Sequence, residues 1–125
     1  MKNMKKLTAL AAVAVLGWSV FAMAAPTTVT GVLVDRACYT KDKANTTNEH
    51  KGMGATCAQD CAKKGQPVAL VTDKGEVYTV TGDLAAEMNK ALVPHMSHTV
   101  TLTGEVTDAG GKKSIAATNL KMVSK

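Results

Sequence analysis

The chain has 125 residues and a formal net charge of +5, which arises from 15 Lys and Arg against 10 Asp and Glu. Three of the basic residues, and none of the acidic ones, lie within residues 1–24, so the remainder of the chain is nearly neutral. Its aromatic residues beyond that segment are Tyr39 and Tyr78. A surface for single-stranded nucleic acid needs aromatic rings stacked in a basic groove, so we expect no nucleic-acid partner.

Residues 1–24 have the pattern of a secretory signal peptide. Basic residues precede an apolar run from Leu7 to Ala22, and a small-x-small sequence marks a cleavage site after Ala24. A retained membrane anchor is the alternative, which the short apolar run disfavours. The sequence therefore predicts a periplasmic or secreted protein, with no stable membrane insertion after cleavage and with one domain over residues 25–125.

Five strands are predicted in that domain, from alternating apolar residues or from runs of β-branched ones. The second and third flank Asp73-Lys74-Gly75, which is typical of a tight hairpin turn. Gly31 and Gly104, inside the first and fourth strands, suit the bends that close a small barrel. The predicted strands cover residues 28–34, 68–72, 76–81, 99–107 and 115–123.

A helix is predicted over residues 83–92, between the third and fourth strands. Leu84, Met88 and Leu92 recur every fourth residue and form one apolar face, and Pro94 ends the helix. A helix at this place among five strands is the arrangement of an OB-fold barrel. We therefore expect a mainly β protein, a small OB-like five-stranded barrel with Leu84 and Met88 closing one end. A small β-sandwich is the alternative architecture.

An insert between the first two strands, residues 35–66, contains all three cysteines of the chain. Its first half, rich in polar residues, is expected to be a loose loop. Its second half predicts a short helix, Cys57–Lys64, with Thr56 as the N-cap of a capping box. Cys57 then lies at the first helical position, where unpaired N–H groups favour a thiolate, and Cys61 lies one turn later on the same face.

The cysteines Cys38, Cys57 and Cys61 allow three interpretations, because an odd number cannot all form internal disulfides. The first is a metal site for Cu(I) or Zn, with His50 or Met53 as an additional ligand. The second is a disulfide from Cys38 to Cys57 or Cys61 that staples the insert of a structural or partner-binding module. The third is a thiol–disulfide redox centre with Cys57 as the nucleophile.

A second group of potential ligands, His95, Met96 and His98, follows the helix predicted over 83–92. Imidazole and thioether groups at this spacing would suit copper. Alternatively, Met96 packs inward while the two histidines are solvated at a turn. The sequence contains no Ser-His-Asp arrangement, phosphate-binding loop or paired-carboxylate site, so we expect a binding protein in preference to an enzyme.

The motifs Asp35-x-x-Cys38 and Cys57-x-x-x-Cys61, set among the strand and glycine pattern that follows Gly31, resemble a set of small exported bacterial proteins of unknown function. The resemblance covers nearly all of residues 25–125. It implies an OB-like barrel and a site at the three cysteines, without a particular activity, and it does not include the two histidines near residue 96. On this basis we expect an exported binding protein with a three-cysteine metal site.

Overall fold

The computed structural model describes residues 26–47 and 57–125. The predicted signal peptide, the N-cap Thr56 and the proposed ligands His50 and Met53 lie outside these described residues. None of the described helices is both long enough and apolar enough to cross a membrane. The strands are β1 (Thr27–Asp35), β2 (Val68–Val71), β3 (Val77–Thr81), β4 (Thr99–Ala109) and β5 (Lys112–Ser124). The helical segments are α1 (Arg36–Lys41), α2 (Cys57–Lys63), η1 (Asp83–Ala85), α3 (Ala86–Asn89) and η2 (Val93–His95).

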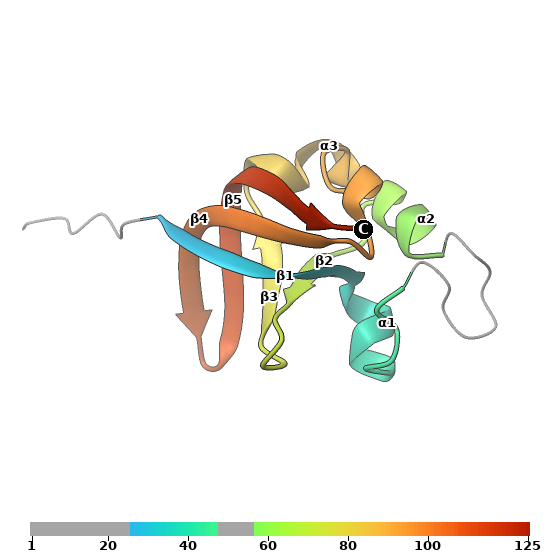
Figure 1. The fold of residues 1–125 in the computed structure, drawn as a ribbon, viewed down its shortest axis with the longest axis horizontal. Coiled ribbons are helices and arrows are strands. Elements are labelled where there is room, and N and C mark those ends of the chain that lie inside the picture. Colours follow the sequence, from blue (N-terminus) through green and yellow to red (C-terminus); the bar gives the residue numbers. More distant parts are fainter. Residues whose placement is uncertain (1–25, 48–56) are drawn as a thin grey trace, which may run out of the picture.

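The five strands form one mixed sheet that closes into a ring (Figure 1). The order around the ring is β1-β2-β3-β5-β4, and β1 closes it because it pairs with both β2 and β4. Every neighbouring pair is antiparallel except β3 and β5, which run parallel. The five strands predicted from the alternation of apolar residues are confirmed, and the protein is mainly β.

Two glycines allow strands of the ring to approach each other closely. A Cβ atom at Gly31 would collide with the backbone carbonyl of Val71, and one at Gly104 would collide with the carbonyl of Ala116. The pairing of β4 with β5 also shifts its register next to Gly104. These positions therefore need glycine because a side chain would push the backbones apart.

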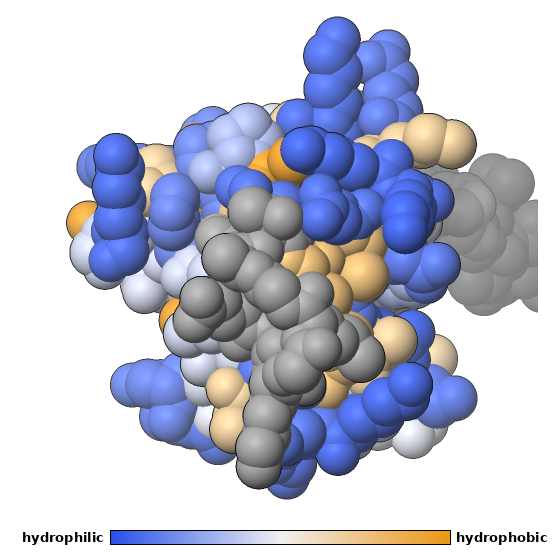
Figure 2. All heavy atoms as spheres, turned by 90° about the vertical axis from the view of Figure 1, so that its right-hand side faces the viewer, coloured by the Kyte–Doolittle hydropathy of each residue, from blue (hydrophilic) through white to orange (hydrophobic). Residues whose placement is uncertain are grey.

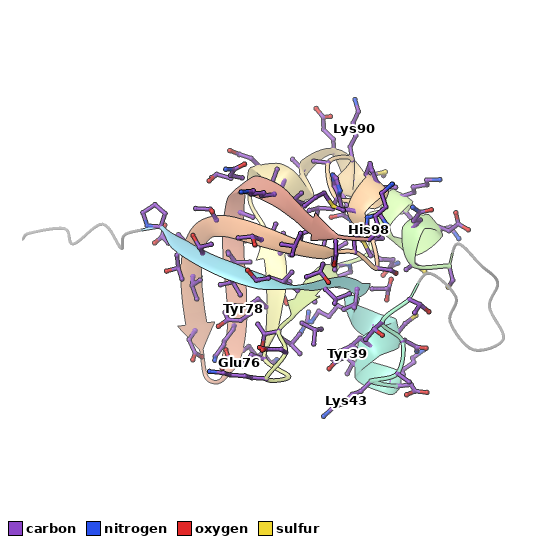
Figure 3. All side chains as sticks on the ribbon, viewed as in Figure 1. Tyr39, Lys43, Glu76, Tyr78, Lys90 and His98 are labelled. Carbon is purple, nitrogen blue, oxygen red and sulfur yellow. The ribbon has the colours of Figure 1, made fainter. Side chains whose placement is uncertain are left out.

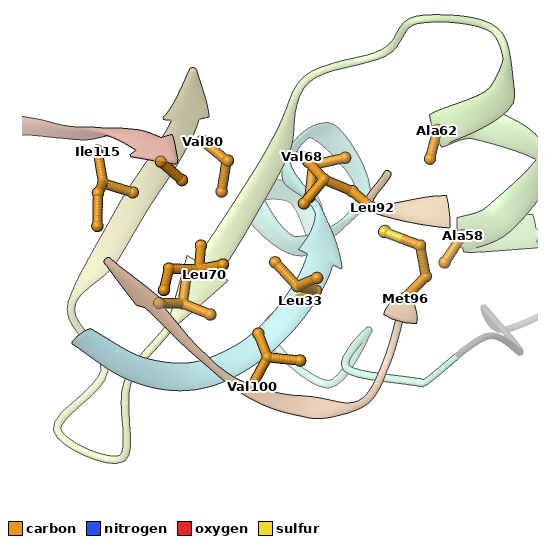
Figure 4. Close-up of a cluster of buried hydrophobic side chains, with 12 residues drawn as sticks. Leu33, Ala58, Ala62, Val68, Leu70, Val80, Leu92, Met96, Val100 and Ile115 are labelled. Atoms are coloured by element: carbon orange, nitrogen blue, oxygen red, sulfur yellow. The ribbon is translucent and has the colours of Figure 1, made fainter. Parts of the chain in front are cut away.

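The main core fills the inside of the ring and continues under the helical segments at one end (Figure 4). Side chains from the strands form its centre, and Leu92, Met96 and two alanines of α2 extend it. A smaller cluster packs Tyr39 of α1 against the outer side of β1 and β2. Among the fully buried strand residues at the centre are Leu33, Leu70, Val100, Leu102 and Ile115.

The single helix predicted over residues 83–92 is wrong. The segment instead forms η1, the short α3 and then η2, and Glu87, Met88 and Asn89 all have left-handed φ values of 54°, 56° and 59°. Met88 is 66% exposed, so it does not close the ring, whereas Leu92 is fully buried. The physical reason lies in the Asn89 amide, which donates to the carbonyls of Ala62 and Gln66 and draws the chain toward the end of α2.

Candidate functional site

The site begins at Asp35, the last residue of β1. Its carboxylate accepts a hydrogen bond from the backbone N–H of Cys38 at 2.9 Å and so caps the N-terminus of α1. The Asp35 residue is only 2% exposed. Helix α1 was not predicted, because the polar sequence from Tyr39 onward was expected to be a loop. The spacing of an acidic residue three positions before the donor N–H is nevertheless an N-cap signal that could have located it.

The three cysteines lie on two neighbouring helices, Cys38 on α1 and the pair Cys57 and Cys61 on α2. All three are half-buried, and no disulfide joins them in the described part of the chain. The cysteines therefore lie at the end of the molecule that α1 and α2 form. At this end, hydrophobic surface is visible between hydrophilic residues (Figure 2). The structure thus brings the predicted cysteines into one region together with Asp35, which belongs to the Asp35-x-x-Cys38 motif but was not predicted as a site residue.

Among the three cysteines, Cys61 has the pKa that is shifted furthest from its ordinary value. Its pKa is raised to about 12, first by burial, then by the negative charge of Asp35, and then by Cys57. Cys57 raises the pKa of Cys61 through its charge and through a side-chain hydrogen bond. The side chains of the Cys57-x-x-x-Cys61 motif therefore interact, and this interaction favours the protonated form of Cys61.

Cys38 is held in the protonated form by similar causes. Burial raises its pKa, and the charge of Asp35 and a hydrogen bond to that carboxylate raise it further. Cys57 also contributes in the same direction, while Lys41 opposes it. Because both Cys38 and Cys61 interact with Asp35 and with Cys57, the buried carboxylate and the three sulfur atoms act as one electrostatic cluster.

Helix α2 is fixed to the core by small residues. Ala58 and Ala62 are buried against Met96 and the end of the ring (Figure 4). The preceding positions on the helix, Cys57 and Cys61, therefore lie at the edge of the core rather than inside it. At the end of the helix, the Asn89 amide donates to the Ala62 carbonyl at 3.0 Å. This contact holds the strained left-handed turn and α2 together.

Glu76, Tyr78 and Lys113 form a second polar cluster, in which the side chains form hydrogen bonds with one another. The carboxylate of Glu76 accepts from the Tyr78 hydroxyl at 2.8 Å and from the Lys113 ammonium at 3.3 Å. These two donors hold the pKa of Glu76 below its usual value. Tyr78 lies in β3 and Glu76 just before it, whereas Tyr39 lies in α1 (Figure 3). None of the site residues expected from the sequence belongs to this cluster.

The described residues contain no group of three or more His, Cys, Asp or Glu side chains arranged to hold a metal ion. His50 and Met53, the additional ligands expected for the cysteine site, fall outside the described residues. The three-cysteine metal site therefore stays a prediction.

The three potential ligands expected at residues 95–98 do not lie together in the structure. Met96 is fully buried in the main core, as the alternative interpretation of this segment expected. His95 and His98 are half-buried, and their ring centroids are 6.4 Å apart in an edge-to-face arrangement. The two imidazoles thus remain neighbours without Met96 between them.

Comparisons of the chain with protein-family models, with curated proteins and with solved structures found no match. The resemblance to small exported bacterial proteins, drawn from the Asp35-x-x-Cys38 and Cys57-x-x-x-Cys61 motifs, stays a prediction.

Proposed function

We propose that this chain is an exported thiol–disulfide redox protein built on an OB-like barrel. The observation that carries the proposal is the placement of Cys57 and Cys61 one turn apart on α2, both half-buried and not joined by a disulfide, with the charge of the buried Asp35 carboxylate acting on Cys61. Two thiols at this spacing can alternate between a dithiol and a disulfide, and a thiolate is the nucleophile in disulfide exchange.

The OB-like part of the proposal is supported by the order of the strands. The ring runs β1-β2-β3-β5-β4, and helical segments lie between β3 and β4. A five-stranded Greek-key barrel with a helix in that connection is the OB arrangement. The export part is supported by the signal-like pattern of residues 1–24.

The reaction proposed for the reduced protein has two steps. The Cys57 thiolate attacks one sulfur of a substrate disulfide, which forms a mixed disulfide and releases the other substrate sulfur as a thiolate. Cys61 then attacks the Cys57 sulfur, which forms the Cys57–Cys61 disulfide and releases the second substrate thiolate. The protein loses two electrons and two protons, and the substrate disulfide gains both to become two thiols.

Asp35 fits the second step of this reaction. Cys61 must lose its proton before it can attack, and the Asp35 carboxylate lies near enough for its charge to raise the pKa of that thiol. The same carboxylate can accept the proton directly or through water as Cys61 attacks. Burial and then the charge of Asp35 therefore keep Cys61 protonated in the resting dithiol, and Asp35 provides a base when the mixed disulfide forms.

The test is disulfide exchange with a small aromatic disulfide, followed by intact-mass analysis without reducing agent. The wild-type protein is expected to reduce the probe and to lose the mass of two protons, with the bond mapped to Cys57 and Cys61. Cys57→Ser should abolish exchange, whereas Cys38→Ser should retain it and serves as the matched control. Exchange by Cys57→Ser at the wild-type rate would overturn the proposal.

A second candidate is the metal site expected from the sequence, with Cu(I) or Zn bound by Cys38, Cys57 and Cys61. It is favoured by the interactions that link all three thiols in pairs. Metal analysis of protein purified without chelators should then give one ion per chain, and each single Cys→Ser variant should lose it. A stable disulfide with neither exchange activity nor metal would instead indicate a stapled structural or partner-binding module.

A further inference from the structure

A second group of possible metal ligands lies at the end of the ring where the chain enters β4. His95 ends η2, and His98 immediately precedes β4. Met122 lies near the end of β5 and pairs across the sheet with Val100. Figure 3 shows His98 beside the last part of β5, so the two histidines and this methionine come from segments that only the fold brings together.

The closest contact in this group joins a nitrogen to a sulfur. The Nδ1 atom of His95 lies 3.0 Å from the Sδ atom of Met122. The His98 ring approaches the His95 ring edge to face, with 6.4 Å between the centroids. Two imidazoles and one thioether thus converge on one half-buried region of the surface.

The backbone between the two histidines holds this arrangement in place. Ser97 has a left-handed φ of 67°, which is unusual for a residue other than glycine. Its N–H donates to the Leu33 carbonyl at 2.8 Å, and the His98 carbonyl accepts from the Leu33 N–H at 3.2 Å. The turn between the two histidines is therefore attached to β1 by two backbone hydrogen bonds to Leu33.

His98 also has unused hydrogen-bonding capacity. Its Nδ1 atom is buried and has no hydrogen-bond partner among the described residues. Buried polar atoms are almost always paired with protein, water or an ion.

We propose that His95, His98 and Met122 form a Cu(I) site that is separate from the cysteine cluster. The two nitrogen donors and the soft thioether are the ligand types that favour this ion over Mg²⁺ or Ca²⁺, which prefer oxygen. The methionine in this site is not the Met96 suggested by the sequence, because that side chain lies in the core. The site does not depend on thiol redox activity.

The test measures Cu(I) binding to the full chain with its thiols blocked by alkylation, so that the cysteines cannot compete. Bathocuproine competition is expected to show one Cu(I) per chain, and the NMR signals of the Met122 methyl group and of both imidazoles should shift on binding. Met122→Leu should weaken binding at least tenfold, and His95→Gln and His98→Gln should weaken it further. Met88→Leu, which alters an exposed methionine elsewhere, should bind as the wild type does.

Two results would overturn the site. One is wild-type affinity in Met122→Leu and in both histidine variants, with thermal unfolding showing that all three variants are folded. The other is Cu(I) binding that leaves the Met122 methyl signal unmoved. Because the thiols are blocked throughout, neither result depends on whether Cys57 and Cys61 carry out disulfide exchange.

Discussion

The Oδ1 atom of Asp35 accepts a hydrogen bond from the backbone N–H of Cys38 at 2.9 Å, and the same carboxylate also interacts with the Cys38 thiol. One buried acid therefore begins helix α1 and places a negative charge beside the thiols. The capping role needs only a side-chain oxygen, whereas the electrostatic role needs the charge. Substitutions can separate these two roles.

Asp35→Asn should make Cys61 easier to deprotonate. Asn caps a helix about as well as Asp, so α1 should remain, while loss of the negative charge lowers the pKa of Cys61 from about 12. We expect alkylation of Cys61 at a fixed mildly alkaline pH to be faster by roughly tenfold, as measured by mass spectrometry of the peptide.

Asp35→Ala is the comparison variant, because it removes the charge and the cap together. It should show the same faster alkylation, with an additional loss of about 1 kcal/mol in the free energy of unfolding. If Asp35→Asn leaves the alkylation rate of Cys61 unchanged, the carboxylate does not control that thiol.

The reduced protein should lose stability at high pH through Cys61. The pKa of Cys61 is raised from 9.0 to about 12 in the folded chain, so the folded state keeps a proton that the unfolded state releases. Its stabilising effect is complete below pH 9 and is lost as the pH rises toward 12. The slope is at most about 1.4 kcal/mol per pH unit.

Urea unfolding under reducing conditions, repeated across this pH range, measures the effect. Other groups also titrate there, so the informative quantity is the difference between wild type and Cys61→Ser. That variant should show a shallower decline in the free energy of unfolding. Parallel curves for the two proteins would mean that the Cys61 thiol titrates alike in the folded and unfolded chains.

Asn89→Ala should destabilise the chain by roughly 2–4 kcal/mol. The substitution removes two buried hydrogen bonds, to the carbonyls of Ala62 and Gln66, and leaves alanine at a left-handed φ of 59°. Chemical denaturation measures the loss, and Asn119→Ala, at an exposed position in β5, should change stability by less than about 0.5 kcal/mol. Equal effects of the two variants would contradict the role of Asn89.

Met96→Ala should cost roughly 2–5 kcal/mol of stability, as for other buried methionines. Met96 is fully buried, whereas Met88 is 66% exposed, so Met88→Ala should have little effect. Thermal unfolding of the two variants checks this contrast. A larger loss of stability for Met88→Ala than for Met96→Ala would instead support the single helix predicted over residues 83–92, in which Met88 is buried.

The strands and the short helix that carries Cys57 and Cys61 could be predicted from the amino-acid sequence alone. Alternation in residues 99–107 and the turn at Gly75 act over a few neighbouring residues, so the pattern alone identifies them. The Asp35-x-x-Cys38 spacing was also visible, although its meaning as a helix cap became clear only from the structure.

The contacts between segments distant in the sequence could not be predicted, because they depend on the fold of the whole chain. Leu84, Met88 and Leu92 have helical spacing, but hydrogen bonds from Asn89 to the end of α2 outweigh that local preference and turn Met88 outward. Likewise, no local pattern connects His95 with Met122, which meet because β5 returns beside β4. Periodicity reports which face of a segment is apolar, whereas the partner that covers this face depends on how the whole chain packs.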